Sequence, residues 1–246
     1  VEQRISSHTV LRGNVETELG RSAPGDAGCG CAYPEDVSQQ TVDWSNQIHA
    51  SLSRTVAALP GMRERLGGRS ATALASVAGR RIAVTHGDER SLAGWGCDRP
   101  ALRQAQRQAE LASWLNAAGV DVLATSHTCA AAALQLPHGV VINNGAAGLP
   151  NFNNGRYGLV TRISLRPHPG ALYRSVHRGL TIEAVPLAYD HHTFLADFDR
   201  QWPAGSPAQL SYRERILRGT ASPPEAALLG GFRLASTLCA MEDLHL

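Results

Sequence analysis

Residues 80–127 constrain the fold more than any other part of the sequence. The run "RRIAVTHGD" (80–88) predicts a buried strand that enters a glycine turn, and "VDVLATSH" (120–127) predicts a second strand. Between them, residues 100–119 predict a helix, with a proline in its first turn and Gly119 at its end. This order of strand, helix and strand predicts an α/β fold in which the two strands pair in parallel. Polar residues that follow such strands would gather at their carboxyl ends, where open α/β sheets place their sites.

The segment before residue 80 predicts a mixture of elements. "HTVLRGN" (8–14) is typical of a short strand that breaks at its glycine, and residues 20–36 are rich in Gly, Pro and Asp and predict a loop. Apolar residues then recur at helical spacing from Ser38 to Leu59, where Pro-Gly ends the helix.

Beyond Cys129 the sequence predicts shorter elements. An alanine-rich helix is expected directly after Cys129, and a strand is expected within residues 138–148. Three strand-like runs separated by short turns favour an antiparallel meander over 157–166, 171–179 and 180–189. Residues 189–246 are expected to form a C-terminal helical extension. Because no linker divides the chain, we expect a single domain over residues 1–246.

Composition excludes several classes of protein. All 23 basic residues are arginine, the formal net charge is +2, and no basic block indicates dedicated nucleic-acid binding. No apolar stretch is long enough to cross a membrane. Five cysteines, an odd number, argue against a disulfide scaffold and favour a cytoplasmic location. The sequence also lacks a Gly-X-Ser-X-Gly elbow, a P-loop and a dinucleotide-binding fingerprint.

Metal-ligating side chains follow three of the expected strands. They occur in "GNVE" (13–16), "HGD" (86–88) and "SHTC" (126–129). Imidazole nitrogens and an amide oxygen suit Mn, Fe or Zn, and a thiolate would favour Zn or Fe. Taken alone, a histidine at a strand end is usually a hydrogen-bonded surface or core residue rather than a metal ligand.

A cysteine nucleophile with a histidine base is the alternative chemistry for His127 and Cys129. The two residues lie two apart on one expected strand, so their side chains should face the same way. That arrangement is compatible with shared metal ligation, whereas a nucleophile and its base generally approach from separate elements.

The ordered set of these blocks resembles the calcineurin-like metallophosphoesterases. "LRGNVE", "VTHGD", "TSHTC" and "INNGAAGLPNF" are similar to that family's Gly-Asn-His-Asp/Glu block, its lone His after a strand, its Gly-His-X-His block and the strand that follows. The resemblance covers about the first two-thirds of the chain. It implies an α/β fold of two packed mixed β-sheets flanked by helices, with the site at the carboxyl ends of the strands.

The resemblance also implies a ligand set. Asn14, His86 and His127 match the ligands of one metal, and Cys129 stands where the family has the His that binds the other. A thiolate is a chemically reasonable substitute there. Val15 replaces the family's usual catalytic His, so another residue must take its role, or none does.

Several neighbouring residues are expected around this site. Glu16 could orient the loop or a ligand, Asp88 could support His86, and Asn144 would lie nearby. Trp95 could form a substrate-facing wall or could simply pack against the sheet. The loop that contains Cys29-Gly-Cys31 is expected near the mouth of the site.

Two family blocks have no counterpart before Asn14. Asp-X-His and Gly-Asp-X-X-Asp are absent there, and a later Asp-X-His spacing, Asp190 and His192, opens an apparent helix. We therefore expect a missing N-terminal segment of two short βα units, about 50 residues long.

The resemblance implies hydrolysis of a phosphoester. The family uses a metal-activated hydroxide and two divalent ions (Mn, Fe or Zn) on a small-molecule or protein-borne phosphomonoester or phosphodiester. Two alternatives remain open: a non-catalytic binding protein with an incomplete metal site, and a mononuclear metallohydrolase.

Overall fold

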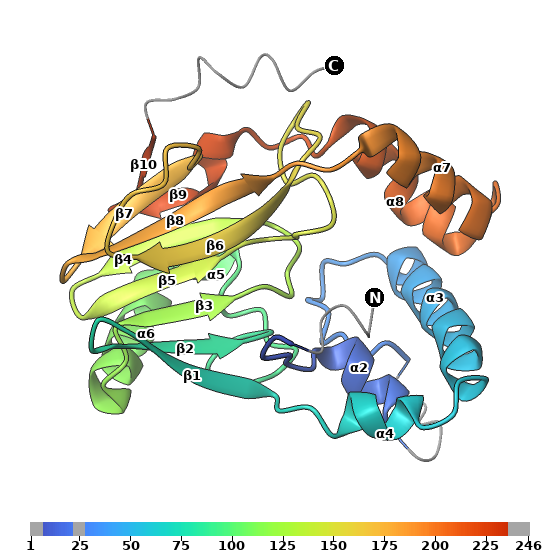
Figure 1. Cartoon of the computed structure of the whole chain (residues 1–246), viewed down its shortest axis with the longest axis horizontal. Helices are drawn as coiled ribbons and strands as arrows, with labels where there is room; N and C mark the ends of the chain where they lie inside the picture. The colour runs from blue at the N-terminus through green and yellow to red at the C-terminus, as the bar shows by residue number, and fades with distance from the viewer. Residues whose placement is uncertain (1–6, 22–27, 236–246) are drawn as a thin grey trace.

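Two β-sheets packed face to face form the centre of the molecule (Figure 1). The computed structural model describes residues 7–21 and 28–235. One sheet has the strand order β1-β2-β3-β5-β4-β9, and the other has the order β10-β7-β8-β6. The first contains β1 (Thr72–Val77), β2 (Arg80–Thr85), β3 (Val122–Thr125), β4 (Ala132–Leu136), β5 (Gly139–Asn143) and β9 (Leu228–Gly230). The second contains β6 (Gly158–Ser164), β7 (Tyr173–His177), β8 (Leu180–Leu187) and β10 (Arg233–Leu234).

The six-stranded sheet is mixed. Its centre, β2-β3-β5, is parallel, whereas β1 pairs with β2 and β4 pairs with β5 in antiparallel fashion. The helix between β2 and β3 makes the expected crossover. The predicted fold class, two packed mixed sheets flanked by helices, is confirmed.

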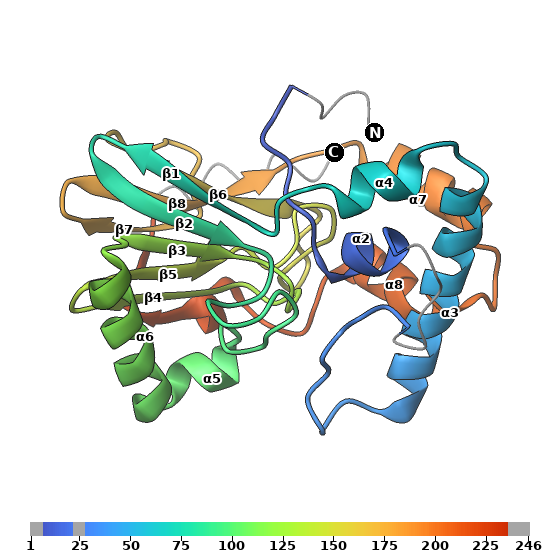
Figure 2. The same cartoon turned by 90° about the horizontal axis from the view of Figure 1, so that it is seen from below.

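The helices form two groups (Figures 1 and 2). One group covers the outer face of the six-stranded sheet and consists of α5 (Arg99–Arg103) and α6 (Ala105–Ala118). The other lies beside the sheets and consists of α2 (Asn14–Leu19), α3 (Gln39–Ala57), α4 (Met62–Gly67), α7 (His191–Gln201) and α8 (Pro207–Arg218). A 3-10 turn, η1 (Pro224–Ala227), then leads into β9. Among the described residues, no helix is long and apolar enough to cross a membrane.

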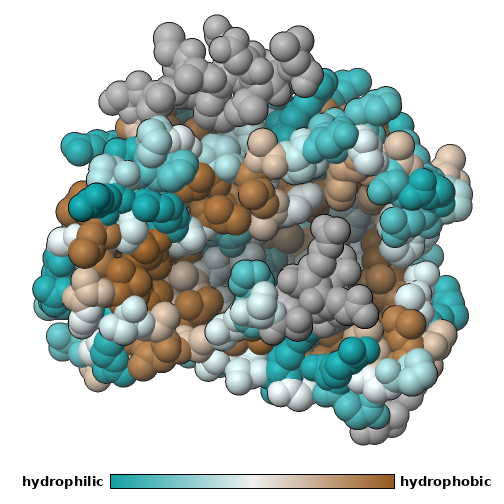
Figure 3. Space-filling model, viewed as in Figure 1, coloured by the Kyte–Doolittle hydropathy of each residue, from teal (hydrophilic) through white to brown (hydrophobic). Residues whose placement is uncertain are grey.

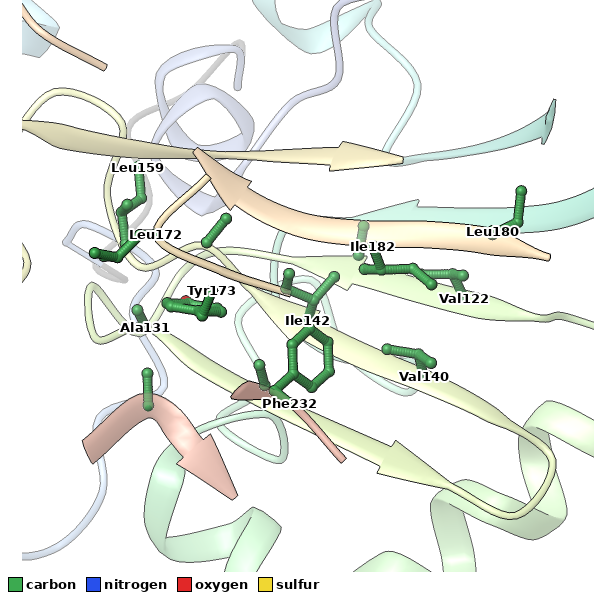
Figure 4. Close-up of a cluster of buried hydrophobic side chains, with 14 of the residues drawn as sticks. Val122, Ala131, Val140, Ile142, Leu159, Leu172, Tyr173, Leu180, Ile182 and Phe232 are labelled. Atoms are coloured by element: carbon green, nitrogen blue, oxygen red, sulfur yellow. The ribbon is translucent and has the colours of Figure 1, made fainter. Parts of the chain in front are cut away.

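Alternation along the central strands builds two core layers. Val122 and Ala124 of β3 face the second sheet, where they meet Leu180 and Ile182 of β8 (Figure 4). Leu123, between them, packs with the apolar side chains of α6 on the other face. Successive side chains of a strand point to opposite faces, so one short apolar run serves both layers.

Three expectations about local structure are wrong. Residues 8–14 form no strand; an irregular segment leads into α2 at Asn14. The segment after Cys129 contains β4 rather than a helix. Its residues pair with β5 in antiparallel fashion, and this tertiary pairing overrides the helix preference of their composition. The helix expected over 100–119 is interrupted at Gln104, whose ψ of 125° is extended, and Gly119 in the left-handed region ends the second part.

The second sheet is antiparallel but is not a meander. β8 lies between β6 and β7, because β7 and β8 form a tight hairpin at Arg178-Gly179 (φ 47° and 83°), while β6 pairs with the other edge of β8. Residues 189–246 contain α7 and α8 and then β9 and β10, which return to the two sheets; residues 236–246 lie outside the described part.

Candidate metal-binding site

Asn14 lies at the first turn of α2 and is held in one orientation. The backbone N–H of Gly13 donates to the Glu16 carboxylate at 2.8 Å, so Glu16 fixes the start of this helix. The Asn14 amide is 5% exposed, and its Nδ2 donates to the Cys29 carbonyl at 2.7 Å and to Cys31 Sγ at 3.1 Å. The amide oxygen Oδ1 is therefore turned toward His86. The loop of Cys29 and Cys31 contacts the site, as expected.

His86 and His127 follow two neighbouring parallel strands and meet at the same rim. His86 comes directly after β2, and His127 comes two residues after β3. The backbone N–H of Ser126 donates to the His86 carbonyl at 3.0 Å, which joins the two strand ends. His86 Nε2 lies 2.9 Å from Asn14 Oδ1 and 3.1 Å from His127 Nδ1. The structure thus brings together the three residues predicted to hold one metal.

One proton lies among these three atoms, and His86 carries it. An amide oxygen only accepts, so His86 carries its proton on Nε2, directed at Asn14 Oδ1 and bordering His127 Nδ1. His127 then carries its proton on Nε2, an atom that is buried without a hydrogen-bond partner. Two lone pairs, on Asn14 Oδ1 and His127 Nδ1, therefore face the His86 Nε2 proton, and the polar atom on the far side of His127 is left unsatisfied. With the proton of His86 on Nδ1 instead, all three atoms could ligate one cation.

Burial keeps both imidazoles neutral. The pKa of His127 is lowered to about 4, first by burial and then by the neighbouring His86. The pKa of His86 is also lowered by burial, against the attraction of the Glu16 carboxylate. Neutral imidazole is the form that ligates a metal, so the donor set fits one borderline divalent cation.

Cys129 is placed differently from the expectation. β3 ends at Thr125, and His127 and Cys129 lie in the following loop, each with φ of 53°, so the argument that they face one way along a strand is wrong. The Cys129 side chain is exposed, and its carbonyl accepts a hydrogen bond from Arg215 at 2.8 Å. Within residues 7–21 and 28–235, no group of three or more His, Cys, Asp or Glu residues is arranged to hold a metal. Ligation of a second metal by Cys129 stays a prediction.

Asp88 shapes the loop after His86. Its buried carboxylate accepts backbone N–H groups from Arg90, Ser91 and Gly96 at 2.9, 2.8 and 3.0 Å. The loop brings the Trp95 ring edge-on to His127, with centroids 5.4 Å apart. Trp95 Nε1 is buried without a partner. Trp95 therefore packs on a candidate ligand.

The paired asparagines at the end of β5 link the site to its surroundings. Asn143 is fully buried; it donates to the Cys97 carbonyl and to Thr128 Oγ1, and it accepts from Gly145 N–H. Asn143 thus fixes the loop that carries His127, a role that the sequence analysis missed. Asn144 instead donates to the Leu159 carbonyl at 2.7 Å and ties the two sheets together.

Substituting Asn143 with Leu is expected to lower the free energy of unfolding by roughly 2–3 kcal/mol, because its buried partners lose their hydrogen bonds. Urea denaturation measures this change. Asn144→Leu is the matched control and should cost about 1 kcal/mol. Equal losses in the two variants would contradict the role given to Asn143.

Two other candidates have structural explanations. Val15 lies at the edge of an apolar cluster with Leu19, Val56 and Leu66, so it contributes no polar atom to the site. Asp190 caps α7 by accepting from the N–H of Thr193 at 3.0 Å, which accounts for the Asp-X-His spacing.

Comparisons with known proteins identify the fold. No protein-family model and no curated protein matches the sequence. A hypothetical protein of Pyrococcus horikoshii superposes with a TM-score of 0.57 and 10% identity, over 89% of this chain and 77% of that one. A metallophosphoesterase of Sphaerobacter thermophilus superposes with a TM-score of 0.53 and 12% identity, over 89% of this chain and 80% of that one. The chain therefore shares the fold of a metallophosphoesterase.

Proposed function

We propose that this protein is a metal-dependent phosphoester hydrolase whose site lies at the rim formed by Asn14, His86 and His127. The proposal is carried by the convergence of three side chains: His86 Nε2 lies 2.9 Å from Asn14 Oδ1 and 3.1 Å from His127 Nδ1. The fold shared with a metallophosphoesterase supports the same reaction class.

The three residues would hold one divalent ion, of Mn, Fe or Zn, through an amide oxygen and two imidazole nitrogens. When bound, such an ion supplies Lewis acidity: it polarises a phosphoryl oxygen and lowers the pKa of water. We propose a second ion beside the first, with Cys129 among its ligands. The substrate is a small-molecule or protein-borne phosphoester, and the location is cytoplasmic.

The protein's own side chains orient and shield this site. Cys29 and Cys31 hold the Asn14 amide so that its oxygen, rather than its nitrogen, faces the histidines. Trp95 covers one side of His127, and Tyr33 lies against Trp95 with ring centroids 6.1 Å apart. These rings exclude water from the buried side of His127, which strengthens its interaction with a cation.

Two observations favour a second candidate, a non-catalytic protein with the same fold. Val15 offers no imidazole at the start of α2, and the described residues assemble donors for one ion only. Donors for one ion only are equally consistent with a mononuclear metallohydrolase.

Metal content and turnover separate these candidates. The purified protein should contain tightly bound metal by mass spectrometry and should hydrolyse p-nitrophenyl phosphate or bis-p-nitrophenyl phosphate with Mn, Zn or Fe. One metal per chain with no response to Cys129→Ser would favour the mononuclear hydrolase. Bound metal without turnover on either ester would favour the binding protein. If no metal binds under any loading condition, the hydrolase proposal is wrong.

A further inference from the structure

Arg215 reaches from α8 to the loop of the candidate metal site. Its Nε donates to the Pro150 carbonyl at 2.7 Å, and its Nη2 donates to the Cys129 carbonyl at 2.8 Å. Cys129 lies two residues after His127, so the guanidinium lies against the loop that carries a candidate ligand. Figures 1 and 2 show α8 beside the carboxyl ends of the strands. The helix thus brings a positive charge next to metal ligands that are themselves neutral.

Arg215 differs from the other arginines of α8 in its partners. Arg213 pairs with Asp199 at 2.8 Å, and Arg218 pairs with Glu214 at 2.9 Å. Within the described residues, no carboxylate pairs with Arg215, and its Nη1 has no hydrogen-bond partner. Burial lowers the pKa of its guanidinium, so the charge is only partly compensated. A charged, half-buried arginine without a counter-ion is a binding group for an anion, and its planar fork matches phosphoryl oxygens.

Tyr212 adds a second donor beside Arg215. It lies one turn earlier on the same side of α8. Burial raises the pKa of the Tyr212 phenol, and the nearby Cys129 thiol adds to the rise. The hydroxyl therefore stays protonated and is able to donate a hydrogen bond. A guanidinium and a phenol thus lie together next to the loop that carries His127.

A small aromatic pocket adjoins these donors. It has a volume of about 200 Å³ and lies between α3, α8 and the loop that follows Cys31. Tyr33, Trp44 and Tyr212 form its aromatic walls; the other lining residues are hydroxyl-bearing side chains and one leucine, and none carries a charge. The pocket is smaller than the roughly 300–1,000 Å³ of sites for drug-sized ligands, so it fits a single ring system. Aromatic walls stack on a planar ring, and hydroxyl groups bind its polar substituents.

Two walls of the pocket connect it with the candidate metal site. The Tyr33 ring lies against Trp95, which in turn packs on His127. On the other side, Tyr212 lies near Cys129 and next to Arg215. In Figure 3, chiefly hydrophilic side chains cover α7 and α8, whereas hydrophobic side chains gather over the two sheets. The aromatic walls belong instead to the side of α8 that packs on α3.

We propose that Arg215 and the pocket of Tyr33, Trp44 and Tyr212 form one binding site, the α8 site, for a phosphoester whose organic group is a planar, uncharged ring. Arg215 would bind a phosphoryl oxygen, and the pocket would bind the ring. The reaction at the phosphoryl group rests on the proposed function, whereas binding at the α8 site does not.

The α8 site also answers the absence of an imidazole at Val15. Val15 packs in an apolar cluster and offers no donor to a phosphoryl group, whereas Arg215 offers one from another element. An aliphatic ester, such as phosphoserine, has no ring and would leave the pocket unfilled. The substrate class is therefore an aryl or heteroaryl phosphoester.

Equilibrium dialysis of the protein in the presence of a chelator tests the role of Arg215. The probes are p-nitrophenyl phosphate and p-nitrobenzyl alcohol, a similar ring without a phosphoryl group. Arg215→Met should weaken binding of p-nitrophenyl phosphate at least about tenfold and leave binding of the alcohol unchanged. Arg218→Met is the matched control, since the Arg218 side chain is 79% exposed and already paired, and it should change neither.

Three results would overturn the role of Arg215. Equal effects of Arg215→Met and Arg218→Met would show that the contact is not specific. Loss of alcohol binding in Arg215→Met would show that Arg215 only ties α8 to the Cys129 loop. If Arg215→Met does not fold, Arg215→Lys replaces it: this variant keeps the charge but loses the planar fork, and it should weaken binding of p-nitrophenyl phosphate alone. Unchanged binding in that variant would overturn the proposal as well.

A second pair of variants tests the pocket. Trp44→Ala should weaken binding of both nitroaromatic probes at least about fivefold and leave binding of inorganic phosphate unchanged. Trp202→Ala is the control, because Trp202 does not line the pocket. Binding of methyl phosphate as tight as that of p-nitrophenyl phosphate, or equal effects of the two tryptophan variants, would overturn the proposal.

These measurements separate the α8 site from the hydrolase proposal. They need no metal, so the expected differences would support the α8 site even if no metal binds and no ester is hydrolysed. Conversely, bound metal and turnover together with unchanged binding in Arg215→Met would overturn the α8 site and leave the hydrolase proposal intact.

Discussion

Replacing His127 is expected to weaken binding of the divalent cation at least about 100-fold, with a matching loss of turnover. Substitution of residues that only support a ligand typically costs 10–100-fold, so loss of one of three ligands should cost more. His86→Ala should have the same effect, because His86 Nε2 contacts both other donor atoms, at 2.9 and 3.1 Å. Isothermal titration calorimetry with Zn or Mn measures the change.

The backbone at His127 requires a careful choice of variant. Its φ of 53° lies in the left-handed region, which asparagine tolerates better than alanine does. His127→Asn therefore removes the imidazole with less backbone strain and should be compared with His127→Ala. His138→Ala is the control, since His138 is exposed in the β4–β5 turn, far from the rim. Unchanged metal affinity in both His127 variants would exclude this residue as a ligand.

The sequence predicted the ends of β2 and β3 correctly, and these two strands are parallel neighbours. The apolar runs before His86 and His127 form β2 and β3, and parallel pairing brings their carboxyl ends to one rim. The strand predicted before Asn14, which was one reason to expect this residue at the rim, does not exist, and Asn14 begins a helix instead. Its position depends on contacts with a loop 15 and 17 residues away, which no periodicity reveals.

The errors share a physical cause. Residues 132–136 have a composition that favours a helix, yet long-range pairing with β5 makes them a strand. Of the hairpin formed by β1 and β2, only β2 was predicted. The hairpin is marked by an Ala-Gly turn with φ of 49° and 76° rather than by an apolar run. Asn143 and Cys31 were not assigned roles because their importance comes from tertiary hydrogen bonds.

Loss of the Arg107 side chain is expected to destabilise the protein by about 3–5 kcal/mol, because it leaves the buried Glu89 carboxylate with only the exposed Arg90 as an ion-pair partner. Arg107 projects from α6 and forms two hydrogen bonds with Glu89 at 2.7 and 2.6 Å; the side chains are 9% and 2% exposed. Arg107 Nε also donates to the Gly96 carbonyl at 3.0 Å, so the same guanidinium supports the loop that carries Trp95. Arg107→Met should therefore both lower the urea midpoint and alter the fluorescence of Trp95.

Arg90→Met is the matched control for this ion pair. Arg90 contacts the same Glu89 carboxylate at 3.2 Å, but its side chain is 62% exposed, so its loss should cost less than about 1 kcal/mol. The double variant Arg107→Met with Glu89→Gln should recover part of the lost stability, because it removes the buried charge that has lost its buried partner. Equal destabilisation by Arg90→Met and Arg107→Met, or no recovery in the double variant, would contradict this prediction. Either result would show that burial of the Arg107–Glu89 pair does not determine how much the pair contributes to the free energy of unfolding. Recovery of stability without recovery of the Trp95 signal would separate the ion pair from the hydrogen bond to Gly96 and would assign the positioning of Trp95 to the latter.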